Sequence, residues 1–505
     1  MSAAATSTSP ASDRPLQGLR LLITDFDLQQ REHRGIAVYS KGLLRALRAS
    51  GAETWLLTDF EPPMRDPGLK ELPEAARELI FSARVLEALM IGAEGLRSRW
   101  AEVKLSKKGG RLGRLLKRWA QWRELPARFW LRRRYQLERM PRFPLRALDD
   151  SPYLRQERLS YLQDVDGILC ARYLYLNASR LALGRRPKPV RLDLGSSFDG
   201  LITTAPINIS SADGRRVVQT VHDLIPLEYV PHLDHVVLFA KRIASTLPAR
   251  KLFVSSSSRR KYEHVYPRSQ DVGGAVIVQA PSLQMPTGRA RSILQQQVLR
   301  PSRRAKARHG ELLPFRYLLF NSSVEPRKNL LFVIKAYRLS GLAELGIRLC
   351  VTGQLQPDAY SKAVAEQADD AVLLTGYIDE TTKANLFLHA MAVLSPSLVE
   401  GFGIPVLDGA CVGSAVIASP SDSHLEIKAL QDFDRYVWLC DTTDPTAWAL
   451  AMRELAKAES LRISDLDLER EQRLERYDRT SALVFEAFRQ TVCEQVLASI
   501  ASPQG

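Results

Sequence analysis

The chain has 505 residues, 45% of them apolar and 25% charged, which is typical of soluble globular proteins with full hydrophobic cores and excludes disordered, collagen-like and fibrous chains. It lacks the apolar run of about eighteen residues that a spanning helix needs, and its five cysteines lack metal-ligand spacing, so we expect a cytosolic protein with reduced thiols. The net charge is +15, yet residues 97–148 hold 17 basic and 3 acidic residues, which leaves the remainder nearly neutral.

Strands and helices alternate in the first half of the chain, after a tail over residues 1–16 that we expect to be disordered. Hydrophobic spacing predicts strands at 18–23, 53–58, 167–171, 190–194, 217–221 and 252–255, and helices at 37–48 and 236–247. Residues 61–160 interrupt this alternation and are predicted to be a basic helical insertion. The first domain is expected to span 17–305 and to end in a polar run rich in Arg.

The second half alternates more regularly. Strands are expected at 317–320, 347–352, 371–374, 392–395, 415–418 and 436–439, and helices at 330–339, 358–367, 379–389, 405–411 and 444–461. Such alternation indicates βαβ units with parallel strands. We therefore predict an α/β fold with two doubly wound, Rossmann-like domains facing a cleft. The second domain is expected over 306–480, followed by a helical terminus over 481–505.

A first polar motif follows the strand predicted at 317–320 and opens the next helix. It contains Arg327 and Lys328, two adjacent cations at a strand end. Cations beside a helix N-terminus suit a diphosphate, because charge-assisted hydrogen bonds and the helix amides both favour an anion. The alternative is a solvated loop with an ordinary helix cap.

A second motif follows the strand predicted at 392–395. It combines two glycines, two acids and a proline suited to the first position of a helix. Its candidate binding residues are Glu400, Gly401, Phe402, Gly403, Ile404 and Asp408. One acid can meet each end of an extended ligand, with helix amides facing phosphate between them. The alternative is a glycine-rich turn with an acid placed favourably for the helix dipole.

A third candidate is His222, followed by Asp223, at the end of the strand predicted at 217–221. A lone histidine is more often structural than catalytic. Its position at the carboxyl end of a strand favours a functional role, because ligands of doubly wound sheets bind there.

These segments together resemble the family-four glycosyltransferases of the GT-B fold, and most of all mannosyltransferase-like members from O-antigen and capsule clusters. The resemblance is strong over residues 315–425, moderate over 165–265 and weak over 15–55. The segments that carry it are 320–329, 351–353, 374–377, 396–408, 220–226 and 253–258. The insertion has no counterpart in that family.

The resemblance implies a retaining transferase that moves a sugar, mannose-like by preference, from a nucleotide-sugar to a glycan or lipid-linked acceptor. In the family, the residue matching Glu400 contacts the donor sugar and that matching His222 lies near the reacting carbon. The residues matching Arg327 and Lys328 clamp the diphosphate. The loop matching Arg34 and Gly35 covers the phosphates or the acceptor, and the terminal helix returns to the first domain.

The second family acid is a glutamate that holds the ribose hydroxyls, whereas this chain has the shorter Asp408, so a looser or water-bridged contact is expected. The chain also offers no evident metal motif: Asp164-Val165-Asp166 has suitable spacing but precedes a strand and is interpreted as a turn. We therefore expect metal-independent catalysis without a cofactor, in which the nucleotide-sugar is a substrate.

The basic segment, residues 97–148, contains four of the seven tryptophans. One helical face carries Leu112, Leu115, Leu116, Trp119 and Trp122. Apolar and basic faces on one helix suit an anionic membrane surface, which would make the protein peripheral to the membrane and fit a lipid-linked acceptor. A helix pair packed on the first domain is an equal alternative. Nucleic-acid binding is disfavoured, because no recognition motif accompanies the charge.

Two further function classes compete with a transferase. An inactive GT-B scaffold, or a protein that binds anionic polymers, is suggested by Asp408 and by the long insertion. A sugar-nucleotide epimerase on the same fold would act without an acceptor. Binding of a nucleoside diphosphate separates the first alternative from an enzyme, and conversion of a sugar-nucleotide without an acceptor identifies the second.

Overall fold

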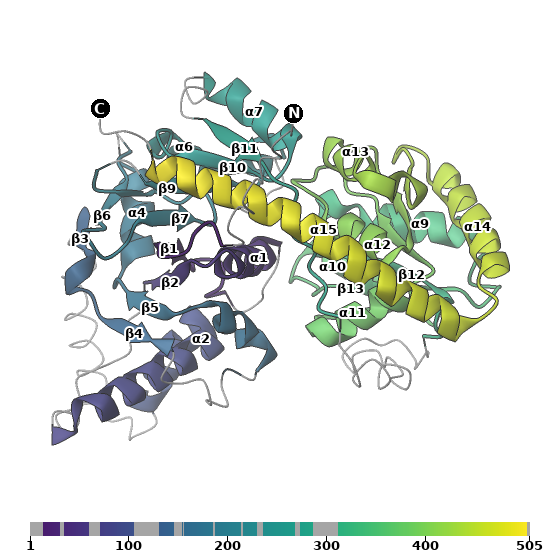
Figure 1. The fold of residues 1–505 in the computed structure, drawn as a ribbon. Helices are drawn as coiled ribbons and strands as arrows, with labels where there is room; N and C mark the ends of the chain where they lie inside the picture. Colours follow the sequence, from purple (N-terminus) through teal and green to yellow (C-terminus); the bar gives the residue numbers. More distant parts are fainter. Residues whose placement is uncertain are drawn as a thin grey trace, which may run out of the picture.

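The computed structural model describes residues 14–30, 35–59, 71–105, 131–145, 154, 156–184, 187–213, 216–229, 236–267, 273–285 and 312–501. They form two α/β domains bridged by a long C-terminal helix (Figure 1). The predicted fold class is confirmed, since each domain is built on a mainly parallel sheet. Among the described helices, none combines the length and apolar character needed to cross a membrane.

The N-terminal domain contains an eight-stranded sheet in the order β11-β10-β9-β7-β1-β2-β5-β4. All neighbouring strands are parallel except β4, which pairs antiparallel with β5. Its strands are β1 (Arg20–Thr24), β2 (Glu53–Thr58), β4 (Arg142–Pro144), β5 (Gly167–Cys170), β7 (Gly200–Thr203), β9 (Val217–Val221), β10 (Arg250–Phe253) and β11 (Gly274–Val276). A small sheet joins β3 (Arg134–Gln136), β6 (Val190–Asp193) and β8 (Ile209–Ser211).

Local sequence explains these elements. The strands of the main sheet are short apolar runs because helices cover both faces; all five residues of β9 are buried. Helix α1 (Gly35–Ala49) turns one apolar face inward, with Leu43, Leu44 and Leu47 fully buried. The other helices of this domain are α2 (Glu74–Leu105), α4 (Leu174–Ala182), α5 (Ile225–Glu228), α6 (Val236–Ser245) and α7 (Ser256–Val265).

The C-terminal domain contains six parallel strands in the order β14-β13-β12-β15-β16-β17. The strands are β12 (Tyr317–Asn321), β13 (Arg348–Thr352), β14 (Val372–Gly376), β15 (Ala392–Ser395), β16 (Ala415–Ala418) and β17 (Val437–Leu439). The helices are α9 (Leu330–Ser340), α10 (Ala359–Glu366), α11 (Glu380–His389), α12 (Ile404–Val412), α13 (Asp422–Lys428) and α14 (Pro445–Arg462). Asp358, Asp379 and Asp444 cap α10, α11 and α14 through their side chains.

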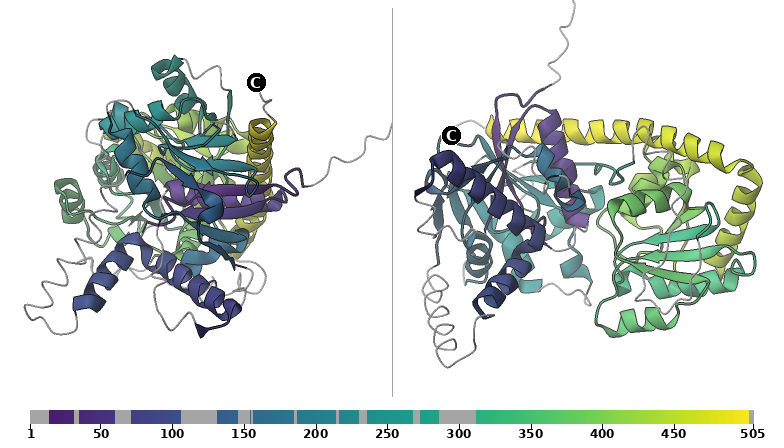
Figure 2. Two further views of the ribbon diagram at one scale, coloured as in Figure 1. Left: turned by 90° about the vertical axis from the view of Figure 1, so that its left-hand side faces the viewer. Right: turned by 90° about the horizontal axis from the view of Figure 1, so that it is seen from below.

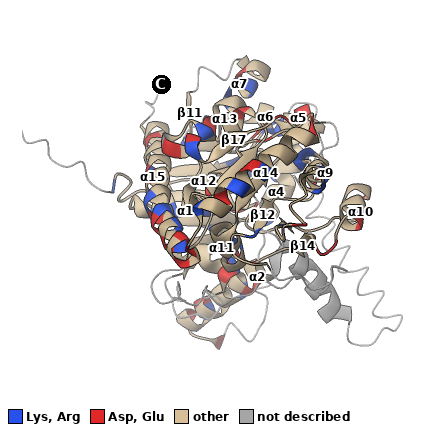
Figure 3. Ribbon diagram, turned by 90° about the vertical axis from the view of Figure 1, so that its right-hand side faces the viewer, with Lys and Arg blue, Asp and Glu red and all other residues tan. Residues whose placement is uncertain are grey.

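Helix α15 (Leu466–Ile500) runs along both domains (Figure 2). In the C-terminal domain, buried Arg473 donates to the carbonyls of Leu388 and Ala390. Farther along, Phe488 packs edge-on against Tyr39 of α1 at 6.0 Å between ring centroids. The helix carries residues of both charges, which are coloured blue and red in Figure 3.

Several sequence expectations are corrected by the structure. Leu16, predicted to lie in the disordered tail, is fully buried in the core of the N-terminal domain. The strand predicted at 190–194 is present as β6, which lies in the small sheet. The insertion predicted to be helical contains the strands β3 and β4, and its start packs on the domain, because Val85, Leu86 and Leu89 of α2 are buried. The domain boundary predicted at 305 and the amphipathic stretch at 112–122 lie outside the described residues.

Candidate active site

The candidate site lies where the winding of the C-terminal sheet changes direction. Strands β12 and β15 are neighbours, but the chain leaves β12 toward β13 and leaves β15 toward β16. Loops that diverge in this way open a crevice at the carboxyl ends of the strands, where doubly wound proteins bind ligands. The first loop carries Arg327 and Lys328, and the second carries Glu400.

The two loops meet through ion pairs. Lys328 Nζ donates to Glu400 Oε1 at 2.5 Å, and Arg327 Nη1 lies 3.4 Å from Glu400 Oε2. Arg327 also donates through Nε to Glu325 at 2.9 Å, and Ser397 Oγ donates to Glu400 at 3.2 Å. The side chains of Lys328 and Glu400 are 9% and 7% exposed. The structure thus brings these three predicted site residues into one largely buried cluster.

The local backbone explains why both cations point to the same place. Pro326, Arg327 and Lys328 form one short 3-10 turn, in which Pro supplies a suitable φ at the start. Asn329 then adopts a left-handed conformation with φ of 56°, and the chain turns there into α9.

Electrostatics keep Glu400 ionised. Burial alone would raise the pKa of its carboxyl, but Lys328 and then Arg327 outweigh that effect and lower the pKa to about 2. Burial lowers the pKa of Lys328, although Glu400 opposes this shift. Three carboxylates, those of Glu400, Glu325 and Asp223, raise the pKa of Arg327 against the effect of its burial. The carboxylates of the cluster therefore neutralise its two buried cations.

The two glycines of the second motif are required for different structural reasons. Gly403 has φ of +108°, a conformation that side chains disfavour, and it is the N-cap residue directly before α12. Gly401 lies against the N-terminal domain, where an added Cβ would come within 2.9 Å of Asp223 Oδ2 and 3.0 Å of the His222 carbonyl oxygen. Between them Phe402 is 6% exposed, and Ile404 is half-buried at the first position of α12.

His222 lies directly beyond β9 and is only 8% exposed. Its Nε2–H donates to the Thr204 carbonyl at 2.8 Å, which leaves Nδ1 as an acceptor, and its ring packs edge-on against Tyr39. Burial lowers the pKa of His222 to about 4, so the ring is neutral near pH 7. The backbone of His222 lies next to Gly401, so the two domains meet here beside the Glu400 turn.

Two predicted site residues stand apart from this cluster. Gly35 is exposed at the start of α1 with open space around it, and Arg34 lies outside the described residues. Asp408 is fully buried in α12, and both of its oxygens accept hydrogen bonds from Ser282, one from the backbone amide at 2.8 Å and one from the hydroxyl. Burial raises the pKa of Asp408. Its carboxylate therefore binds the interdomain linker and is not open to solvent.

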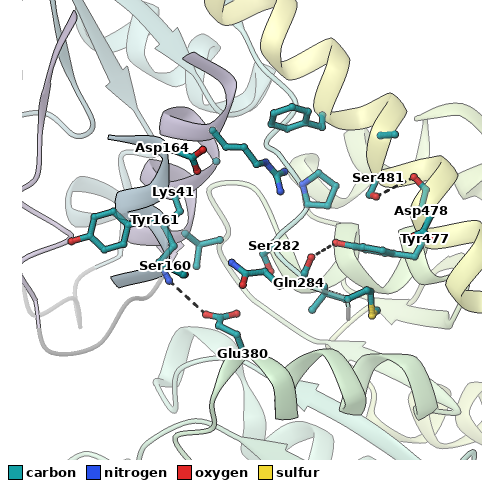
Figure 4. A pocket seen from close by; sticks show the side chains of 18 of the residues that line it. Lys41, Ser160, Tyr161, Asp164, Ser282, Gln284, Glu380, Tyr477, Asp478 and Ser481 are labelled. Atoms are coloured by element: carbon teal, nitrogen blue, oxygen red, sulfur yellow. Dashed lines mark hydrogen bonds and ion pairs between the residues drawn. The ribbon is translucent and has the colours of Figure 1, made fainter. Parts of the chain in front are cut away.

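A cavity of about 520 Å³ lies beside this linker. Figure 4 shows side chains from both domains and from α15 around it, among them Lys41, Glu380 and Tyr477. The residues of the Glu400 cluster do not line this cavity. Ser282 does line it, so Ser282 lies between the cavity and the carboxylate of Asp408. The volume is within the range of small-molecule sites.

The sequence analysis missed a pair of acids. Asp25 and Asp27 follow β1 directly and form an Asp-x-Asp pair at a strand end, which the search for a metal motif in the sequence did not consider. Burial and the nearby Asp59 raise the pKa of Asp25 well above its usual range, and burial raises that of Asp27 to about 7. The signal was visible, since two acids follow a predicted strand. Within the described ranges, no group of three or more His, Cys, Asp or Glu is placed to hold a metal ion.

Comparison with known proteins supports a carbohydrate-active family. Residues 302–479 match the family described as glycosyl transferases group 1. The serotype-specific mannosyltransferase WbdA of Escherichia coli is 30% identical over 127 residues, which are 24% of this chain and 16% of that protein. The O-antigen chain mannosyltransferase B of Escherichia coli is 25% identical over 223 residues, 42% of this chain and 55% of that protein.

The chain therefore matches from about one sixth to about half of the length of these relatives. Among solved structures, the sucrose-phosphate synthase from Thermosynechococcus elongatus is 13% identical and has a TM-score of 0.49. That alignment covers 94% of this chain and 98% of the other.

The buried neutral ring of His222 predicts a pH-dependent stability difference between the wild type and His222→Gln. Because its folded pKa lies below the ordinary value of 6.5, the unfolded state takes up the proton first as the pH falls. As the pH falls from 6.5 to 4, the free energy of unfolding of the wild type should decrease by up to about 3 kcal/mol relative to that of the variant. Urea unfolding across this range measures the difference; parallel curves would show that the ring titrates normally.

Proposed function

We infer the activity of this chain from its membership of the family-four glycosyltransferases, to which it belongs through its group 1 domain. We propose that it is a retaining hexosyltransferase. It moves a sugar, with mannose favoured, from a nucleotide-sugar to a glycan or lipid-linked acceptor. The names of the two Escherichia coli relatives favour mannose as the donor sugar.

The convergence of Arg327, Lys328 and Glu400 at the strand ends is the observation that carries this proposal. When a glycosidic bond to a nucleoside diphosphate breaks, negative charge grows on the leaving phosphate. Fixed cations in a largely buried site stabilise that charge without reorganisation. As a diphosphate enters, it takes over the two cations, and Glu400 becomes available to accept hydrogen bonds from the sugar hydroxyls.

The arrangement favours retention through attack on the face that the leaving group departs from. A double displacement needs a second carboxylate opposite the leaving group. Of the other acids near Arg327, Glu325 pairs with Arg327 itself, and Asp223 accepts the backbone amide of Ile225. In the front-face route, the bond from the anomeric carbon to phosphate breaks and the acceptor oxygen bonds to the same face. The acceptor proton passes to the leaving phosphate oxygen, so no general base is assigned. His222, held neutral, contributes an acceptor at Nδ1 near the sugar.

Asp408 is proposed to bind the donor ribose only after Ser282 releases it. The two hydrogen bonds from Ser282 occupy both carboxylate oxygens, so a donor must displace the linker to reach them. The cavity beside Ser282 offers the linker and a nucleoside space to rearrange. An inactive scaffold would keep Asp408 bound to Ser282 permanently, and nucleotide binding separates these two cases.

The acceptor is proposed to lie over the N-terminal domain near His222 and Gly35. A peripheral membrane contact through residues 97–148 fits a lipid-linked acceptor and a cytoplasmic protein. The basic and aromatic composition of that segment supports this contact.

A screen of purified full-length protein against GDP-mannose, UDP-glucose, UDP-N-acetylglucosamine and dTDP-rhamnose should identify the donor. We expect one of them to raise the midpoint of thermal unfolding, because a ligand at a hundred times its Kd adds about 2.7 kcal/mol of stability. Differential scanning fluorimetry measures the shift. If neither these donors nor their nucleoside diphosphates have any effect, the inactive scaffold is the better interpretation.

Lys328→Ala and Glu400→Ala should each reduce transfer by about a hundredfold or more, since removing one stabiliser of a developing charge commonly costs that much. Lys335→Ala provides the control, because it removes the same side chain from an exposed position in neighbouring α9. Radiolabelled sugar transfer at saturating donor measures the effect. Near-normal turnover of both site variants would refute the roles given to them.

Turnover should persist in EDTA, because fixed cations and helix amides neutralise the leaving phosphate in this proposal. The assay compares protein treated with the chelator and then dialysed against protein supplied with Mn²⁺ or Mg²⁺. Complete loss that Mn²⁺ restores would contradict metal independence and direct attention to Asp25 and Asp27.

A further inference from the structure

A second contact between the domains joins α7 of the N-terminal domain to α13 of the C-terminal domain. The carboxylate of Glu426 accepts the backbone N–H of Ser256 at 2.8 Å through one oxygen and that of Ser257 at 3.0 Å through the other. Beside it, Asp422 accepts hydrogen bonds from Ser257 Oγ and from Arg260 Nη2, both at 3.0 Å. We call this contact the α7–α13 joint.

The amides in the joint are those that a helix cannot satisfy itself. Ser255 caps α7 by accepting the amide of Ser258, but the amides of Ser256 and Ser257 have no acceptor within the helix. A carboxylate at this end also interacts favourably with the helix dipole. Glu426 therefore completes the cap of a helix that belongs to the other domain.

The joint connects directly to both sides of the candidate active site. On the N-terminal side, Ser258 Oγ donates to the His222 carbonyl at 2.8 Å. On the C-terminal side, Ser423 Oγ donates to the carbonyl of Gly401 at 3.0 Å and to that of Glu400 at 3.2 Å. One helix of the joint thus holds the backbone of His222, and the other holds the backbone of Glu400.

The backbone at Gly401 packs tightly against the backbone at His222. A single methyl group on Gly401 would come too close to the His222 carbonyl and to Asp223. A shift of α7 relative to α13 would therefore change the placement of His222 over the Glu400 turn.

A corresponding cap exists on the other side of the site. Glu157 opens the 3-10 segment Glu157–Asp164 of the N-terminal domain and accepts the backbone amide of Glu380 at the start of α11. Lys41 Nζ lies 4.0 Å from Glu380. Helix α11 follows β14 at one edge of the C-terminal sheet, whereas α13 lies between β16 and β17 at the other. Each domain thus lends a carboxylate to a helix of the other, one on either side of the central strands.

We propose that Glu426 is a positioning residue: by capping α7 from the opposite domain it fixes His222 against Glu400 and so couples domain closure to assembly of the active site. This inference rests on the proposed function. Glu426 does not touch the reacting atoms in it. The residues proposed to bind the donor phosphates belong to the C-terminal domain, so this part of the donor site should stay intact when the joint opens.

Glu426→Gln tests the inference in the full-length protein, with Glu263→Gln as its matched control. Glu263 lies on α7 itself, and its carboxylate pairs with Arg259 of the same helix at 2.7 Å, so the same substitution there leaves the Glu426 cap in place. We expect Glu426→Gln to lower kcat for mannose transfer from GDP-mannose about tenfold. KM for GDP-mannose, Kd for GDP by calorimetry and the thermal midpoint should stay close to wild type. Hydrogen exchange should speed up at the start of α7 in this variant alone.

Faster exchange with an unchanged kcat would overturn the inference, as would a parallel loss of GDP binding and thermal stability, which a general structural role would give. A wild type that transfers no sugar would overturn the proposed function, and the positioning role with it. The exchange measurement separates the two failures, because it reports on the joint without any donor.

Discussion

The ion cluster of Glu400 with Lys328 and Arg327 is the interaction on which the site depends. Taking charges out of water is costly unless they are paired, so two cations could not stay largely buried at this crevice without a carboxylate between them. The acid comes from the loop after β15 and the cations come from the loop after β12. The pairing therefore also fixes the two loops to each other at the centre of the sheet. In the proposed function, a diphosphate would take the place of the Glu400 carboxylate as the partner of the two cations.

The N-terminal domain also contributes a charge to this ion cluster, from the other side of the domain interface. Asp223 contributes to the field at Arg327, and the backbone beside it packs on Gly401. The reacting groups proposed for the sugar thus come from both domains, while the groups proposed for the phosphates come mainly from one. This division suits an enzyme that binds its donor first and excludes water from it by closing.

The sequence predicted what is local. Strands β9, β15 and β16 appear over the ranges expected from their apolar runs, and the polar residues at strand ends marked the loops of the site. The short β7 was missed, because Gly200–Thr203 carries too weak a pattern between polar loops. The partner of Asp408 could not be foreseen, since Ser282 lies 126 residues away and nothing local distinguishes a ribose contact from a linker contact. The contact of Glu426 with the backbone amides of Ser256 and Ser257 could not be foreseen for the same reason.

Helix α15 sets a limit on how the domains can move. A continuous helix rises about 1.5 Å per residue and is stiff along its axis. Its first part is anchored by Arg473 in one domain and its last part by Phe488 in the other. The distance between those anchors is therefore nearly constant. The domains cannot move apart along the axis of α15, so they must open by rotating about this helix or by bending it. Opening is then widest far from α15, which makes the side away from the helix the natural route for substrates to come and go.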